Sequence, residues 1–132
     1  MKDGIYKEDL LDGMKSEATF KNGKLNGKET IWHKNGQVIS EANWVNGEIE
    51  GKTKTWNEFG QLIGVDIYKN NMLHGKCTLW NDKGQLVSET IFKENRPFDK
   101  FTLYEDGVKS KEGLANYPKG DSPYNYDGDT IN

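Results

Sequence analysis

The side chains that could bind a metal ion are few and scattered. A zinc site needs three or four clustered Cys, His or carboxylate ligands, and besides its acids the sequence offers only His33, His74 and Cys77. His74 and Cys77 are close in sequence, but we expect Cys77 to be a small buried side chain. Asp127-Gly-Asp129 has part of a calcium loop without its other ligands or terminal Glu. We therefore expect no metal site and no cofactor.

Catalytic patterns are equally sparse. No Gly-rich phosphate-binding loop of the required form occurs. The serines have no histidine at a related position to activate them, and the carboxylates fall at turns or in expected ion pairs. We therefore expect no catalytic residues and a protein that is not an enzyme.

These residues lie in a sequence that repeats every 24 positions. Gly27-Lys-Glu-Thr-Ile-Trp32 is followed by Gly36-Gln37, and the same pattern starts again at Gly51 and at Gly75. A period of this length is typical of stacked repeats. We expect an array over 1–116, with units near 4–26, 27–50, 51–74, 75–98 and 99–116. Residues 117–132, rich in Pro, Gly, Asn and Asp, are expected to form an irregular cap or tail.

The sequence of each unit predicts two short strands joined by tight turns. Asn35-Gly36 and Asn46-Gly47 are strong hairpin signals, because Asn and Gly tolerate the positive φ that such turns require. Two turns per unit give a continuous antiparallel meander of about ten strands. The sequence therefore predicts an all-β protein: a single elongated, twisted antiparallel meander sheet built from about five stacked β-hairpin repeats.

Two-residue turns would fix which residues lie opposite each other. Asn35-Gly36 would place Trp32 opposite Ile39, and Asn46-Gly47 would place Glu41 opposite Lys52. The same reasoning predicts the pairs Glu17–Lys28 and Glu89–Lys100, and places Val65 opposite Lys76. Pairs of opposite charge stabilise sheet register.

The lysines Lys28, Lys52, Lys76 and Lys100 recur at the repeat spacing. Such a row could bind phosphate groups. The expected Glu partners favour a structural role instead, because a paired lysine is less available to an anion.

Two aromatic rows are expected on opposite faces of the sheet. One row contains Trp32, Trp56, Trp80 and Tyr104, and the other contains Phe20, Trp44, Tyr68 and Phe92. Both rows could be the core of a curved sheet. In that case, replacing Trp56 in the central unit should lower the free energy of unfolding by about 3–5 kcal/mol. Alternatively, one row lies open and contacts a partner, since exposed aromatic patches mark interaction surfaces. Trp32, Trp56, Trp80 and Tyr104 are the candidate partner-binding face.

Specificity should lie where the copies differ. These positions are Glu29/Thr53/Cys77, Ala42/Asp66/Thr90 and Glu41/Val65/Glu89.

Composition narrows the partner class. The net charge of −3 gives no electrostatic case for nucleic acid. A single cysteine cannot form an intramolecular disulfide. The chain has no apolar run of signal-peptide or membrane-spanning length, so we expect a cytoplasmic protein.

The pattern Gly-Lys-x-x-x-Trp-x-x-x-Gly-Gln, followed by a second aromatic residue and Asn-Gly, resembles the MORN repeat. It is most similar to the bacterial variant in YwqK-type antitoxins. The resemblance implies a MORN-like sheet that serves as a scaffold or binding surface, and an antitoxin- or immunity-like role in which it binds a toxin or other neighbouring gene product. The alternative that it implies is a membrane- or phospholipid-associated scaffold. It carries no functional residue over to this chain.

Overall fold

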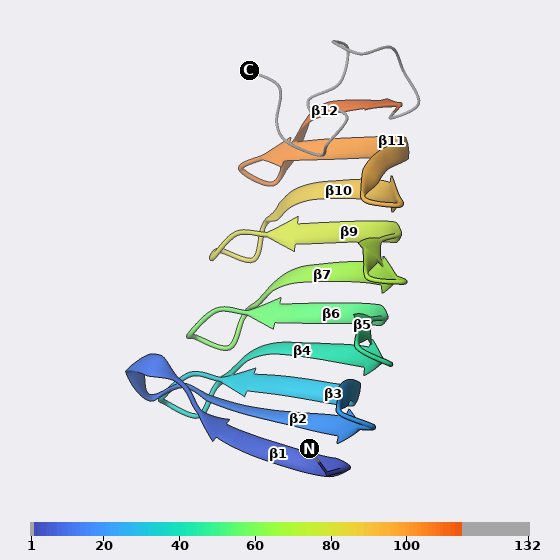
Figure 1. The fold of residues 1–132 in the computed structure, drawn as a ribbon. Coiled ribbons are helices and arrows are strands. Elements are labelled where there is room, and N and C mark those ends of the chain that lie inside the picture. The colour runs from blue at the N-terminus through green and yellow to red at the C-terminus, as the bar shows by residue number, and fades with distance from the viewer. Residues whose placement is uncertain (1, 115–132) are drawn as a thin grey trace.

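The chain forms one open antiparallel β-sheet (Figure 1). The computed structural model describes residues 2–114, apart from the side chains of residues 98–100 and 114. Ten strands cross the sheet in sequence order, and two short strands, β5 and β8, pair beside β4 and β7. The expected all-β meander is confirmed. The end of the fifth unit and the tail expected over 117–132 lie outside the described residues.

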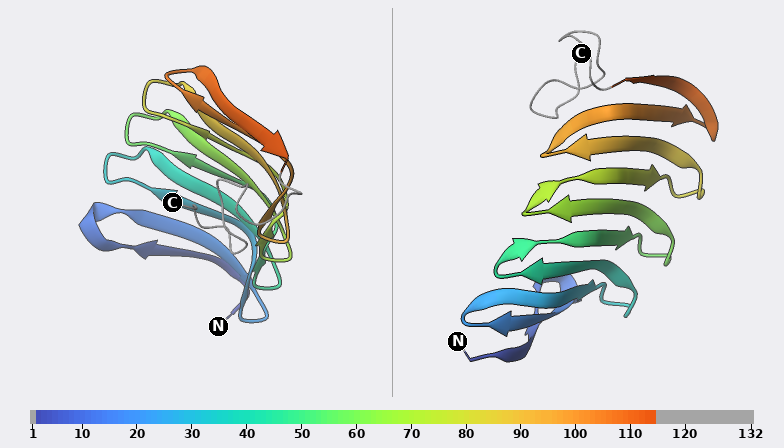
Figure 2. Two further views of the ribbon diagram at one scale, coloured as in Figure 1. Left: turned by 90° about the horizontal axis from the view of Figure 1, so that it is seen from above. Right: turned by 90° about the vertical axis from the view of Figure 1, so that its right-hand side faces the viewer.

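The strands have the following bounds. They are β1 (Gly4–Asp9), β2 (Lys15–Lys21), β3 (Lys24–Trp32), β4 (Val38–Val45), β5 (Glu48–Ile49), β6 (Gly51–Trp56), β7 (Leu62–Lys69), β8 (Met72–Leu73), β9 (Gly75–Trp80), β10 (Leu86–Lys93), β11 (Arg96–Glu105) and β12 (Val108–Leu114). A short 3-10 turn, Leu11–Gly13, joins β1 to β2. The strands are stacked into an elongated, bent and twisted sheet (Figure 2).

At one end of the strands, the two-residue turns have the expected geometry. Asn46 and Gly47 have φ values of 49° and 83°, which is the left-handed geometry of a two-residue hairpin loop. Asn70 and Asn71 adopt the same geometry, with φ values of 51° and 68°. Asn can replace Gly there because its short polar side chain tolerates this region.

The turns at the other end of the strands are one residue longer than expected. The N–H of His33 donates to the carbonyl of Gln37 at 2.8 Å, so the loop contains three residues, 34–36. A three-residue loop ending in a left-handed residue shifts the pairing by one position. Trp32 therefore lies opposite Val38 rather than Ile39.

A bulge interrupts the sheet where each repeat begins. Between β2 and β3, Phe20 pairs with Leu25 but Ala18 pairs with Glu29, so four steps on β3 oppose two on β2. Gly27 lies inside this bulge with a φ of 115°, and a Cβ there would be 3.3 Å from the Cβ of Thr19. Gly27 is therefore required by backbone geometry and by close approach, and the equivalent Gly51 and Gly75 also have a positive φ.

Side chains beside these bulges link one repeat to the next. A carboxylate or amide oxygen just before the repeat glycine accepts a hydrogen bond from the backbone N–H of the next turn. The bonds are Asp3 Oδ1 from Asn22 at 2.7 Å, Asn26 Oδ1 from Asn46 at 3.0 Å and Glu50 Oε2 from Asn70 at 2.7 Å. They align the turns along one edge of the sheet.

Alternation along the strands divides the side chains between two faces. The Lys28 face carries Lys28, Thr30, Trp32, Glu41, Lys52, Lys54, Trp56, Val65, Lys76, Thr78, Trp80, Glu89, Thr102 and Tyr104. The Cys77 face carries Ala18, Glu29, Trp44, Asp66, Tyr68, Cys77, Ser88, Thr90 and Phe101. Of the described side chains that are buried, only Thr102 lies on the Lys28 face.

Candidate interaction surface

The candidate aromatic row lies on the Lys28 face, near the three-residue turns. Trp32, Trp56, Trp80 and Tyr104 are all half-buried. The Tyr104 hydroxyl donates a hydrogen bond to Glu89 Oε1 at 3.0 Å. This bond is the main reason why the pKa of Tyr104 is raised. The row is neither a fully covered core nor a fully open strip, and its role in binding stays a prediction.

The register does not place the expected pairs between repeats directly opposite each other. Glu17 lies opposite Thr30 instead of Lys28. The cause is the bulge at the start of each repeat, which adds two residues to the second strand. The same shift places Glu41 opposite Lys54 instead of Lys52.

The shift recurs in the later repeats. Val65 lies opposite Thr78 instead of Lys76. Glu89 lies opposite Thr102 instead of Lys100, whose side chain is outside the described set.

Ion pairs form within repeats instead. Lys28 Nζ lies 3.2 Å from Glu41 Oε2, and Lys76 Nζ lies 2.6 Å from Glu89 Oε2. In each case the two residues are diagonal neighbours on adjacent strands. The hydrogen bond from Lys76 to Glu89 is the main reason why the pKa of Lys76 is raised.

The central repeat lacks this ion pair. Lys52 occupies the place of Lys28 and Lys76, but Val65 stands where the flanking repeats carry Glu. Lys54 occupies the place of Thr30 and Thr78. Over the described part of the chain, neither Lys52 nor Lys54 forms an ion pair.

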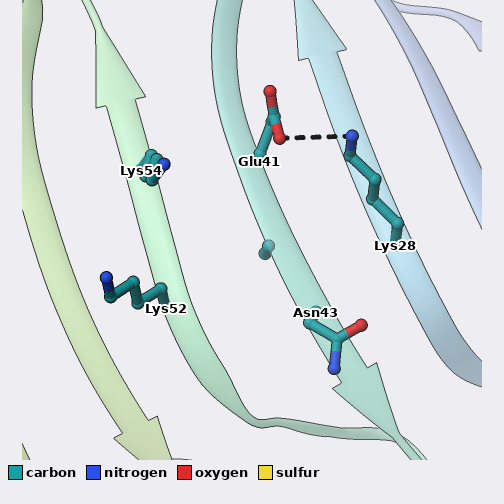
Figure 3. Close-up of a pocket in the computed structure, with 6 residues that line it drawn as sticks. Lys28, Glu41, Asn43, Lys52 and Lys54 are labelled. Atoms are coloured by element: carbon teal, nitrogen blue, oxygen red, sulfur yellow. Dashed lines mark ion pairs between the residues drawn. The ribbon is translucent and has the colours of Figure 1, made fainter.

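These lysines line a shallow hollow of about 210 Å³ between β3, β4 and β6 (Figure 3). Its lining consists of Lys28, Glu41, Ala42, Asn43, Lys52 and Lys54. Figure 3 shows Lys28 turned toward Glu41, with Lys52 and Lys54 on the far side of β4. With three ammonium groups and one carboxylate, the hollow is locally positive on a chain whose net charge is −3.

A second hollow lies nearer the N-terminal edge of the sheet. It measures about 390 Å³ and is lined by Lys7, Glu8, Asp9, Lys15, Ser16, Glu17 and Trp32. It mixes both signs of charge, so it has no clear electrostatic preference for a ligand.

The Cys77 face contains a polar cluster among positions where the repeats differ. The Cys77 thiol, only 6% exposed, is hydrogen-bonded to the Asp66 carboxylate. Burial, reinforced by this carboxylate, raises the pKa of Cys77 to about 12. Burial also raises the pKa values of Asp66 and Tyr68. Cys77 is therefore a buried, weakly acidic side chain, in agreement with the expected structural role.

A similar polar contact lies in the repeat over 27–50. The indole N–H of Trp44 donates to Glu29 Oε1 at 3.2 Å. The sequence located the variable positions on this face but not the bonds that join them. Their signal was the occurrence of polar residues, Glu29 and Asp66, on a strand face that also carries aromatic side chains.

Among the described residues, the candidate metal ligands His33, His74 and Cys77 do not form a metal site. Within residues 2–114, no group of three or more His, Cys, Asp or Glu side chains is arranged to hold a metal ion. Asp127 and Asp129 lie outside the described residues. No helix in the described region is long and apolar enough to cross a membrane.

Comparison with known families agrees with the repeat geometry. The MORN repeat variant model matches residues 25–46, 49–70 and 73–94, which together make up half of the chain. Each match runs from the start of one hairpin unit to the turn before the next. A search of curated proteins finds no match. MORN repeats are generally protein- or membrane-binding modules. This chain belongs to the MORN repeat variant family.

Proposed function

We propose that this chain is a non-catalytic, cytoplasmic protein-binding module with an antitoxin- or immunity-like role. Its Lys28 face would bind a protein partner, such as a toxin encoded by a neighbouring gene. The observation that carries the proposal is the half-buried row of Trp32, Trp56, Trp80 and Tyr104 beside a positive hollow. Trp and Tyr side chains are enriched among the residues that contribute most of the binding energy of protein interfaces.

The sheet architecture supports this proposal. Hairpin units stacked side by side present an extended surface, on which a partner can contact several repeats at once. Repeated residues maintain the surface geometry, and positions that differ between repeats can confer specificity.

The test is co-expression with the product of each neighbouring gene, followed by size-exclusion chromatography with light scattering. We expect a stable stoichiometric complex with one of them, and toxicity of that product when this chain is absent. Trp56→Leu should weaken the complex. Leu79→Ala is the matched control, because Leu79 is 46% exposed on the Cys77 face. The proposal fails if no neighbouring product binds or becomes toxic.

A membrane- or phospholipid-associated scaffold is the second candidate, and the positive hollow is the feature that favours it. The net charge of −3 opposes it, because anionic lipid surfaces attract clusters of several unpaired basic residues. Co-sedimentation with phosphatidylserine vesicles at low salt tests it directly. Absence of binding there would eliminate this candidate.

A further inference from the structure

The central repeat departs twice from its neighbours on the Lys28 face, and both departures make it more positive. Val65 replaces the glutamate found at Glu41 and Glu89, so one negative charge is missing. Lys54 replaces a threonine, so one positive charge is added. The sheet does not need these changes for its pairing, because the flanking repeats pair in the same register without them.

Within the described residues, neither Lys52 nor Lys54 forms an ion pair. Lys54 lies between Glu41 on β4 and Val65 on β7. The Glu41 carboxylate forms its ion pair with Lys28, at 3.2 Å. Lys52 and Lys54 project from the same face of β6, so they repel each other.

Both lysines are also accessible. Lys52 and Lys54 are exposed, and the hollow that they line opens on the sheet surface (Figure 3). A carboxylate placed in this hollow would lie on a surface lined by three lysine side chains and one carboxylate, and would offset the excess positive charge. This attraction is electrostatic, so binding there should weaken with salt.

The size of the hollow favours a protein segment over a membrane. A volume of about 210 Å³ between neighbouring strands accommodates one or two carboxylate side chains. A membrane instead presents an extended anionic plane, which would also face the other charges of a chain with net charge −3.

We propose that the hollow formed by Lys28, Lys52 and Lys54 binds an acidic segment of a protein partner, with adjacent Asp or Glu side chains as its ligands. This inference rests on the proposed protein-binding function and assigns the point of contact and the chemistry of the partner. The aromatic row lies on the same face, so it would contact apolar residues that flank the acidic segment.

A labelled hexaglutamate peptide is the probe, and its binding is measured by fluorescence anisotropy at about 25 mM and about 150 mM salt. Lys52→Gln/Lys54→Gln should weaken binding at least about tenfold at low salt. Val65→Glu should weaken it about fivefold, because it restores an internal partner for Lys52 while using the residue that the flanking repeats tolerate. Circular dichroism and thermal melting confirm that each variant is folded.

The matched control is Lys34→Gln/Lys83→Gln, which removes the same charge from exposed turns away from the hollow. It should change binding by less than about twofold. Equal weakening by the control, or no binding of the unmodified chain at low salt, would overturn the proposal. Lysine-dependent binding to phosphatidylserine vesicles without binding to the peptide would also overturn it, in favour of a lipid ligand.

The same variants separate this inference from the proposed function. If the neighbouring gene product binds the Lys52→Gln/Lys54→Gln variant as tightly as the unmodified chain, the hollow is not the contact site for the partner. The proposed protein-binding function then still holds. If no protein partner is found but hexaglutamate binding depends on these lysines, the hollow is confirmed as an anion-binding site. The proposed protein-binding function is then wrong.

Discussion

On the Cys77 face, buried and half-buried polar side chains contact one another, as Cys77 does with Asp66 and Trp44 with Glu29. On the Lys28 face, polar side chains remain at the surface and form ion pairs such as Lys28–Glu41. Both faces come from the same strands and carry the same repeat period. Burial raises the pKa values of Asp66 and Cys77 on the Cys77 face, whereas the Lys28 face carries exposed lysines that a partner can reach.

The strongest test of the Cys77 face is the reactivity of Cys77. With a pKa near 12, against about 9 for an ordinary thiol, it carries roughly a thousandfold less thiolate at neutral pH. Alkylation by iodoacetamide at pH 8 should therefore be at least about a thousandfold slower in the folded chain than in denaturant. Mass spectrometry over time measures both rates. Rapid labelling of the folded chain would show that this face is open.

Removal of the most buried aromatic ring should have the largest effect on stability. Phe101 is 2% exposed on the Cys77 face. Phe101→Ala should lower the free energy of unfolding by about 3–5 kcal/mol, because it deletes buried apolar contacts and leaves a cavity. Urea unfolding followed by tryptophan fluorescence gives the value. A loss of less than about 1 kcal/mol would contradict the assignment of this face as the core.

The equivalent change on the Lys28 face should cost less. Trp56 is half-buried, so we expect Trp56→Ala to lower the unfolding free energy by about 2 kcal/mol rather than by the 3–5 kcal/mol estimated for a core position. The same urea experiment measures it beside Phe101→Ala. A loss equal to that of Phe101→Ala would remove the distinction between the two faces.

The division into faces could be predicted from the sequence, but the partners across strands could not. Turn chemistry at Asn46-Gly47 and the 24-residue period gave the strand order and the alternation. The bulge at Gly27 adds two residues, an even number, so it keeps every side chain on its expected face while moving its partner. A glycine recurring inside a strand, rather than in a turn, was the available signal for this bulge.

The candidate site follows the same division. The sequence marked Glu41, Val65 and Glu89 as positions where the copies differ, and the structure locates that difference beside the hollow. The position of Lys54 beside Glu41 was missed, because this neighbour on β4 is identified only by the shifted register.

Acid pH should separate the two faces through Asp66. Burial raises its pKa above 3.8, so the ionised carboxylate disfavours the folded state. The protonated form of Asp66 therefore favours the folded state. This contribution to stability is complete below pH 3.8 and is lost as the pH rises through the folded pKa. Asp66→Asn, which keeps an oxygen acceptor for Cys77, should therefore stabilise the chain at pH 7 by up to about 1 kcal/mol. In urea unfolding, the gain should shrink toward pH 3, and a gain independent of pH would contradict the assignment.

The smallest effect is expected where the Lys28 face is already neutralised. The side chains of Lys28 and Glu41 are 65% and 35% exposed, so their ion pair is screened by water and salt. Glu41→Gln should lower the unfolding free energy by only about 0.5 kcal/mol at low salt, and by less at high salt. The same substitution removes the only carboxylate that lines the hollow, so it should strengthen hexaglutamate binding. Urea unfolding and peptide anisotropy on one sample compare the two effects. A large loss of stability without tighter peptide binding would mean that this charge serves the sheet rather than a partner.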